Sequence, residues 1–248
     1  MVSGRAGLTT ADRVLALGWP FSIKNTCASL RSCVGRAPQG EGYEMNDNAV
    51  SLEELWSLVK ALNGDVERCM TALHETPEDD AAGKQFWRRM YARAVFAMID
   101  GATYRMMFHA YAARDRRDVT FSLDELMKLE SYYDFDEDQE AVTTFSKTQM
   151  LDSIRFAFNA FARVHYSDYI LPIHDQSWIL VKEMAYLRQC WQYPRAEQEL
   201  EVYEENIDTL VAGLLWLVER LLELLKSCQL HALEKFAAWE AEEDEPIM

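Results

Sequence analysis

The chain has 248 residues, 49% of them hydrophobic and 12% aromatic, which is enough to bury the core of one or two domains. Its formal net charge is -16 at pH 7. Such a surface repels phosphate at long range and excludes a passive coat on DNA or RNA, so any role on nucleic acid needs a local basic cleft. The five cysteines are scattered without a CxxC pair, and no run of 18 apolar residues occurs. This predicts a cytoplasmic protein without a disulfide framework, a zinc site or a membrane helix.

The first 44 residues differ from the rest in composition. They hold six of the ten glycines, and five Lys/Arg against three Asp/Glu, so their net charge is +2 in a strongly acidic chain. A secretory signal is one interpretation, but Gly-Trp-Pro interrupts the apolar stretch 14–23. A transit peptide is a second interpretation. We favour a third, in which residues 1–44 are a disordered or mis-assigned extension and Met45 is the physiological start.

From residue 45 onward the pattern is helical. Ser51 and Glu54 form a capping box for a first helix, 51–64, which we expect to end at Gly64. A short amphipathic turn, 65–75, and a polar break, 76–80, follow. A long central helix then spans about 81–114.

Ser122 and Glu125 form a second capping box, and further helices are predicted at about 150–165, 177–191 and from 204 onward. Asp175 or Ser177 is the expected N-cap of the helix at 177–191. Strand-like alternation is absent from the pattern. The sequence therefore predicts an all-α fold: a single helical bundle at 45–240, with one long central helix, a long C-terminal helix and an acidic tail at 241–248.

The central helix carries polar residues within an apolar surround. Arg93 and Asp100 are seven residues apart and share a face with Tyr104. Because a buried charge needs a partner, Arg93 and Asp100 are expected to pair with each other or with polar groups on a facing helix. Two interpretations stay open: a satisfied ion pair in the core, or a polar lining of an active cleft.

Metal-site patterns are not found. His74, His165 and His231 have no neighbours at ligand spacing, and Arg105 and His109 form an i,i+4 pair of a kind that is common by chance. The acidic stretch 134–140 alternates carboxylates but lacks the glycine and the terminal glutamate of a calcium loop. We expect no metal and no cofactor.

The stretch LRQCWQYPRAEQELEVYEENIDTL, which begins at residue 187, places Arg188 and Gln189 shortly before Tyr193-Pro194. It resembles the signature of the HEPN superfamily (higher eukaryotes and prokaryotes nucleotide-binding), in which an Arg and a polar residue precede a His often followed by Pro. Other segments resemble bacterial HEPN-like proteins in the same order: FWRRMYARAVFAMIDGATYR, SLDELMKL, DSIRFAFNAFARV and Trp178. The resemblance spans residues 86–223.

This resemblance implies a helical bundle, commonly a homodimer, in which the signatures of two subunits face a shared cleft. Many family members are metal-independent endoribonucleases of toxin–antitoxin or phage-defence systems. In that chemistry the arginine, here Arg188, holds the scissile phosphate of an RNA substrate, and the histidine moves protons as the ribose 2′-OH attacks. A cognate antitoxin or another regulatory protein is then an expected partner.

This chain departs from the family at one position, because Tyr193 replaces the histidine. An ordinary tyrosine has a pKa of about 10, so it can donate a hydrogen bond at neutral pH but is a poor general base. His109 or His165 would have to substitute for it in space. Three hypotheses follow: an active ribonuclease using Arg188, Gln189 and Tyr193 with support from Arg93, Asp100 and Tyr104; a catalytically degenerate HEPN-like interaction or nucleotide-binding protein; and a structural dimer in which Tyr193 only packs.

Overall fold

The computed structural model describes residues 45–114, 119–130, 150–192 and 194–243. Within these ranges the chain forms helices and no strand, which confirms the predicted all-α class. The elements are α3 (Met45–Glu75), α4 (Ala81–Ala112), α5 (Leu123–Glu130), α6 (Met150–Val164), α7 (Trp178–Gln192), the 3₁₀ turn η2 (Glu197–Leu200) and α8 (Glu204–Glu243).

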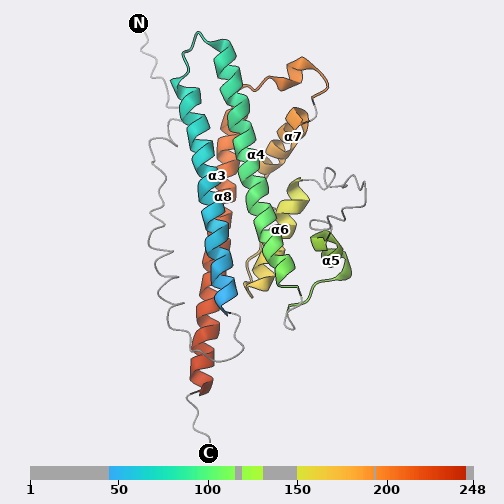
Figure 1. Cartoon of the computed structure of the whole chain (residues 1–248). Helices are drawn as coiled ribbons and strands as arrows, with labels where there is room; N and C mark the ends of the chain where they lie inside the picture. The colour runs from blue at the N-terminus through green and yellow to red at the C-terminus, as the bar shows by residue number, and fades with distance from the viewer. Residues whose placement is uncertain (1–44, 115–118, 131–149, 193, 244–248) are drawn as a thin grey trace, which may run out of the picture.

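The helix α4 is the centre of the bundle. It runs antiparallel to α3, with α8 alongside this pair and with α6 and α7 on its other side (Figure 1). α7 packs mainly against α8. The core lies between these helices, and Leu55, Val95, Phe161 and Leu210, which come from four different helices, are all completely buried. The architecture therefore positions α4 to contact elements from both halves of the chain.

The first helix is longer than predicted. α3 continues through Gly64 to Glu75, so neither the predicted end at Gly64 nor the separate turn at 65–75 occurs, and Ser51 lies inside the helix rather than at its start. The reason is tertiary packing: Val59, Val66 and Met70 are buried as one continuous stripe across the glycine. A glycine costs a helix interior only about 1 kcal/mol, which the burial of these side chains outweighs.

Three helix starts are fixed by short polar side chains. At α4 the Gly83 N–H donates to Asp80 Oδ1 at 2.8 Å. At α5 the predicted capping box is present: the Ser122 N–H donates to Glu125 Oε2 at 2.8 Å, and the Glu125 N–H donates to Ser122 Oγ at 3.3 Å. Before α7 the Asp175 carboxylate accepts the Ser177 N–H at 3.0 Å. Asp175 therefore acts at the entry of this helix, as its sequence position suggests.

Several expectations fall on residues that the structure does not describe. These are the extension 1–44, the acidic stretch 134–140 and Tyr193. At the other end, α8 extends to Glu243, so the first three residues of the expected acidic tail belong to the helix. In the described part of the chain, no helix combines the length and the apolar character that crossing a bilayer requires.

Candidate functional site

The candidate site lies where the second half of α7 meets α4. α7 buries Trp178, Val181 and Met184, three residues that recur every third position and face the bundle. One and two turns beyond Met184, Arg188 and Trp191 reach α4. The rings of Trp191 and Phe96 pack with centroids 6.2 Å apart. This packing sets α7 beside α4 and brings Arg188 to Asp100.

Arg188 and Asp100 form a direct ion pair between these helices. Arg188 Nη2 donates to Asp100 Oδ2 at 2.7 Å, across 88 residues of sequence. The Arg188 side chain is 26% exposed and that of Asp100 is 49% exposed, so the pair lies at the surface rather than in the core. The first sequence interpretation, a satisfied core ion pair, is therefore wrong, whereas the expected partner on a facing helix is present for Asp100.

Two opposing effects act on the pKa of the Asp100 carboxyl. Partial burial raises the pKa of the Asp100 carboxyl above its usual value, and the nearby Arg188 charge only partly opposes this effect. A guanidinium has five N–H donors, and the bond to Asp100 uses one of them. Arg188 can therefore accept a second anionic group, a phosphate included, without moving far from Asp100.

Other residues predicted for the site lie on the same two helices as the pair. Arg93 is exposed on α4, with its Nη1 3.8 Å from Met90 Sδ. It lies two turns, roughly 10.5 Å, before Asp100, so the two do not pair with each other. Tyr104 is 45% exposed one turn after Asp100. Gln189 is exposed next to Arg188 on α7.

The two histidines considered as substitutes for Tyr193 belong to the core of the bundle. His109 and His165 are buried, and their rings stack with centroids 4.8 Å apart at an interplanar angle of 18°. The ring of Phe161 packs against both. His109 is nine residues beyond Asp100 on the same helix, about 13.5 Å along its axis. These imidazoles are part of the core packing, and neither stands beside Arg188.

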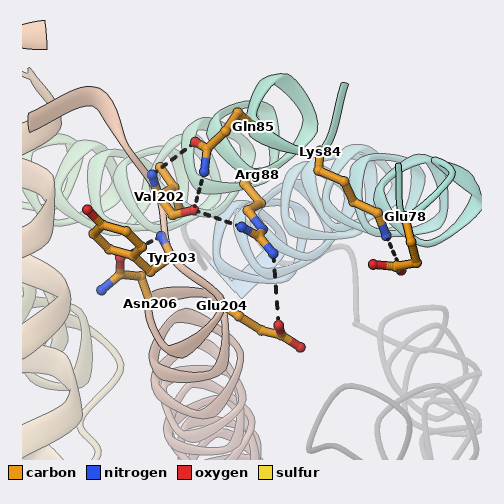
Figure 2. A network of polar contacts seen from close by, with 8 residues as sticks. All are labelled: Glu78, Lys84, Gln85, Arg88, Val202, Tyr203, Glu204 and Asn206. Atoms are coloured by element: carbon orange, nitrogen blue, oxygen red, sulfur yellow. Dashed lines mark hydrogen bonds and ion pairs between the residues drawn. The ribbon is translucent and has the colours of Figure 1, made fainter. Parts of the chain in front are cut away.

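A polar clamp at the start of α4, about 22 Å from Asp100 along the helix axis, was not predicted from the sequence. The Gln85 amide makes two hydrogen bonds to the backbone of Val202: its Nε2 donates to the carbonyl at 3.0 Å, and its Oε1 accepts the N–H at 3.1 Å. Arg88 Nη1 donates to the same carbonyl at 3.4 Å, and its Nη2 lies 3.9 Å from Glu204 Oε2 (Figure 2). The clamp ties the connector between α7 and α8, which follows the HEPN-like signature, to the first turns of α4.

No sequence signal marks Gln85, because a single polar residue in a long helix has no characteristic spacing. Its partner is also a main-chain group, which no side-chain pattern reveals. Just after the clamp, the Tyr203 N–H donates to Asn206 Oδ1 at 2.9 Å. This bond satisfies a backbone donor at the start of α8, as helix-capping side chains do.

Metal-ligand clusters are absent from the described residues: no group of three or more His, Cys, Asp or Glu side chains gathers at a point there. The described cysteines, Cys69, Cys190 and Cys228, are free thiols. Burial raises the pKa of the Cys228 thiol to about 12, which makes it unreactive. Among the described residues, the groups that can act chemically at the α4–α7 surface are thus Arg188, Asp100 and their neighbours.

Comparison with known proteins adds no family assignment: no protein-family model, curated protein or solved structure matches the chain significantly.

Proposed function

We propose that this chain is a HEPN-like, metal-independent endoribonuclease of a toxin–antitoxin or phage-defence type, acting in the cytoplasm on RNA. The observation that carries the proposal is the surface ion pair between Arg188 and Asp100. Arg188 belongs to the HEPN-like signature, and its partner is a carboxyl whose pKa is raised by burial. A phosphate-binding cation next to a proton-accepting group is the minimum that RNA cleavage by the ribose 2′-OH requires.

In this reaction Arg188 exchanges its bond to Asp100 for bonds to the two non-bridging oxygens of the scissile phosphate. The released carboxylate accepts the proton of the 2′-OH as the 2′-oxygen attacks phosphorus. The new O–P bond forms while the bond to the 5′-oxygen breaks, and the leaving oxygen takes a proton from the Tyr193 hydroxyl or from water. The products are a 2′,3′-cyclic phosphate and a 5′-OH. Asp100 thereby takes the role of base, for which an ordinary tyrosine is poorly suited.

A homodimer in which two copies of Arg188 face one cleft would double the local positive charge. This arrangement would supply the local positive charge that RNA binding requires in a chain whose net charge is -16. A cognate antitoxin or another regulatory protein would then restrain the activity by covering this cleft.

A second candidate is a catalytically degenerate HEPN-like interaction or nucleotide-binding protein. The presence of Tyr193 in the histidine position favours it, as does the fact that Arg188 is already paired with a carboxylate.

The test is to incubate the purified full-length chain with total RNA in EDTA, beside Arg188→Ala, Asp100→Asn and Tyr193→His. Arg68→Ala is the matched control, because Arg68 also pairs with an aspartate, Asp65, at 3.1 Å on the surface. The proposal expects cleavage with cyclic phosphate ends by the wild type and by Arg68→Ala, and its loss in Arg188→Ala and Asp100→Asn.

Two outcomes contradict the ribonuclease proposal. Activity that is present only in Tyr193→His identifies a disarmed scaffold and supports the second candidate. Silence from every variant removes the nuclease proposal altogether.

A further inference from the structure

One face of α4 carries a row of aromatic and charged side chains, all of them exposed except Arg89, which is half-buried. We call the α4 strip the six residues Phe86, Arg89, Arg93, Asp100, Tyr104 and Phe108. Their spacing of three, four or seven residues places them on one side of the helix, over a length of about 33 Å. Phe86 is 48% exposed and Tyr104 45% exposed, which is unusual for large aromatic side chains on the central helix of a bundle.

The helix that carries this strip is basic in an acidic protein. α4 contains five Lys/Arg and one acidic residue, Asp100, so its net charge is +4 in a chain of -16. Three of the five cations are used in ion pairs that bind α4 to its surroundings. Lys84 pairs with Glu78, Arg88 with Glu204 and Arg105 with Glu54.

The other two cations, Arg89 and Arg93, face no carboxylate. No acidic oxygen of the described residues lies within 4.0 Å of either guanidinium, and Asp100 is already bound to Arg188. The two arginines are one helical turn apart on the strip, so both can contact the same polyanion. They are local positive charges that the fold leaves without internal compensation.

Charge decides which partner suits this surface. If the same strip of a second copy closed over this one, four arginines would be desolvated together, and the strip offers them only Asp100 of each copy, which already binds Arg188. Such a contact is unfavourable. A polyanion instead compensates Arg89 and Arg93 directly. Aromatic rings on either side of the two arginines, Phe86 before them and Tyr104 after them, add stacking partners for unpaired bases, and proteins that bind single strands combine such rings with a positively charged groove.

We infer that the α4 strip is a binding track for single-stranded nucleic acid. Phosphates lie on Arg89 and Arg93, and bases stack on Phe86 and Tyr104. Arg188 stands beside the track at Asp100, so a strand that follows α4 passes the candidate catalytic pair. That last step rests on the proposed ribonuclease function, whereas binding to the track does not. A functional dimer must therefore leave this strip open.

The experiment measures binding without cleavage. A fluorescein-labelled 12-nucleotide RNA with 2′-O-methyl groups, which cannot undergo 2′-OH attack, is titrated with the full-length chain in EDTA and followed by anisotropy at several salt concentrations. The variants are Arg89→Gln/Arg93→Gln and Tyr104→Ala. The matched control is Arg68→Gln/Arg155→Gln, which removes two surface arginines of α3 and α6, each paired with an aspartate of its own helix. Circular dichroism verifies that each variant is folded.

We expect the Arg89→Gln/Arg93→Gln variant to raise Kd at least tenfold and to reduce the slope of log K against log salt by about 1.4, since each phosphate contact to a single strand contributes about 0.7. Tyr104→Ala should raise Kd about fivefold or more through lost stacking. The control should stay within twofold of the wild type, and Arg89→Lys/Arg93→Lys should recover most of the affinity because it restores the charge.

Three results would overturn the inference. The first is absence of binding by the wild type at 50 mM salt. The second is an equal loss of affinity in the control variant, which would show that binding depends on overall charge and not on the α4 strip. The third is a change of sedimentation mass in Arg89→Gln/Arg93→Gln, which would make the strip a contact between copies. Arg188→Ala separates the two proposals. If this variant loses cleavage but still binds RNA, both proposals are supported. If the wild type binds RNA but does not cleave it, the binding track is supported and the ribonuclease is contradicted.

Discussion

Gly213 of α8 lies directly against Met184 of α7, so closely that a β-carbon on the glycine would overlap the Met184 sulfur atom. Met184 is completely buried, and Arg188 is one helical turn farther along α7. This glycine therefore sets how closely α7 approaches α8, and with it the position from which Arg188 reaches α4.

Gly213→Ala should destabilise the protein by about 1–3 kcal/mol, because overpacking outweighs the gain in helix propensity of about 1 kcal/mol. Gly64→Ala is the matched control. Gly64 is also inside a helix, but a β-carbon there meets nothing within 4 Å, so the substitution should stabilise by about 0.5–1 kcal/mol. Urea unfolding of both variants measures the difference, and equal shifts in the two would contradict this account of the α7–α8 contact.

The ion pair between Arg163 of α6 and Glu125 of α5 predicts a pH dependence of stability. Arg163 Nη1 and Nη2 each donate to the carboxylate at 2.9 Å. These hydrogen bonds are the main reason why the pKa of Glu125 falls from 4.5 to about 2. Because the folded pKa is lowered, the stabilisation is present above pH 4.5 and is lost as the pH falls through about 2.

Glu125→Gln should therefore lower the free energy of unfolding at pH 7 by about 1–2 kcal/mol, a value reduced from the full linkage because the pair is partly exposed. The difference between variant and wild type should shrink to less than half at pH 3. Asp152→Asn, which removes the partner of an exposed arginine 4.0 Å away, should cost under about 0.5 kcal/mol. A loss for Glu125→Gln that is independent of pH would show that packing, not charge, is responsible.

The clamp on Val202 can be tested through the amide that it protects. Gln85→Ala leaves the N–H of the buried Val202 without its side-chain partner and leaves its carbonyl with only the longer bond from Arg88. The loss should cost about 1–3 kcal/mol. Hydrogen exchange of the Val202 amide should accelerate in the variant. Gln198→Ala, at an exposed position of η2, is the control and should change neither quantity. Unchanged exchange in Gln85→Ala would mean that the connector is held by other contacts.

The Arg188–Asp100 pair predicts the direction of a titration. Burial raises the pKa of Asp100 and Arg188 opposes the rise, so Arg188→Gln should raise this pKa further. Carboxyl carbon NMR of Asp100 measures it, with Arg68→Gln as a control that should leave it unchanged.

The sign of the stability effect follows from the same shift. Because the folded pKa lies above 3.8, the favourable contribution of this carboxyl is present below pH 3.8 and is lost as the pH rises through the folded pKa. Asp100→Asn should therefore change stability at pH 7 by no more than about 1 kcal/mol. A large destabilisation would show that the ion pair holds α7 in place rather than serving a site.

Helix periodicity alone was sufficient to predict the fold class and most helix boundaries, because apolar stripes and caps are local signals. It was wrong at Gly64, where burial of Val66 and Met70 against other helices outweighed a local stop signal. The candidate site was predictable only in part. That Asp100 needs a partner follows from chemistry, but the identity of the partner depends on how α7 crosses α4, and that is set by packing contacts such as Trp191 on Phe96.

The 88 residues that separate Asp100 from Arg188 also define an order of assembly. α3 and α4 are joined by the five residues 76–80 and form a hairpin from neighbouring sequence, whereas the ion pair needs α7 to return from the second half of the chain. Contacts between near neighbours close quickly and distant ones slowly. During synthesis the α3–α4 hairpin and the α4 strip are therefore complete before Arg188 is made. Asp100 and Arg188 meet only after α7 has been synthesised and has packed onto the bundle.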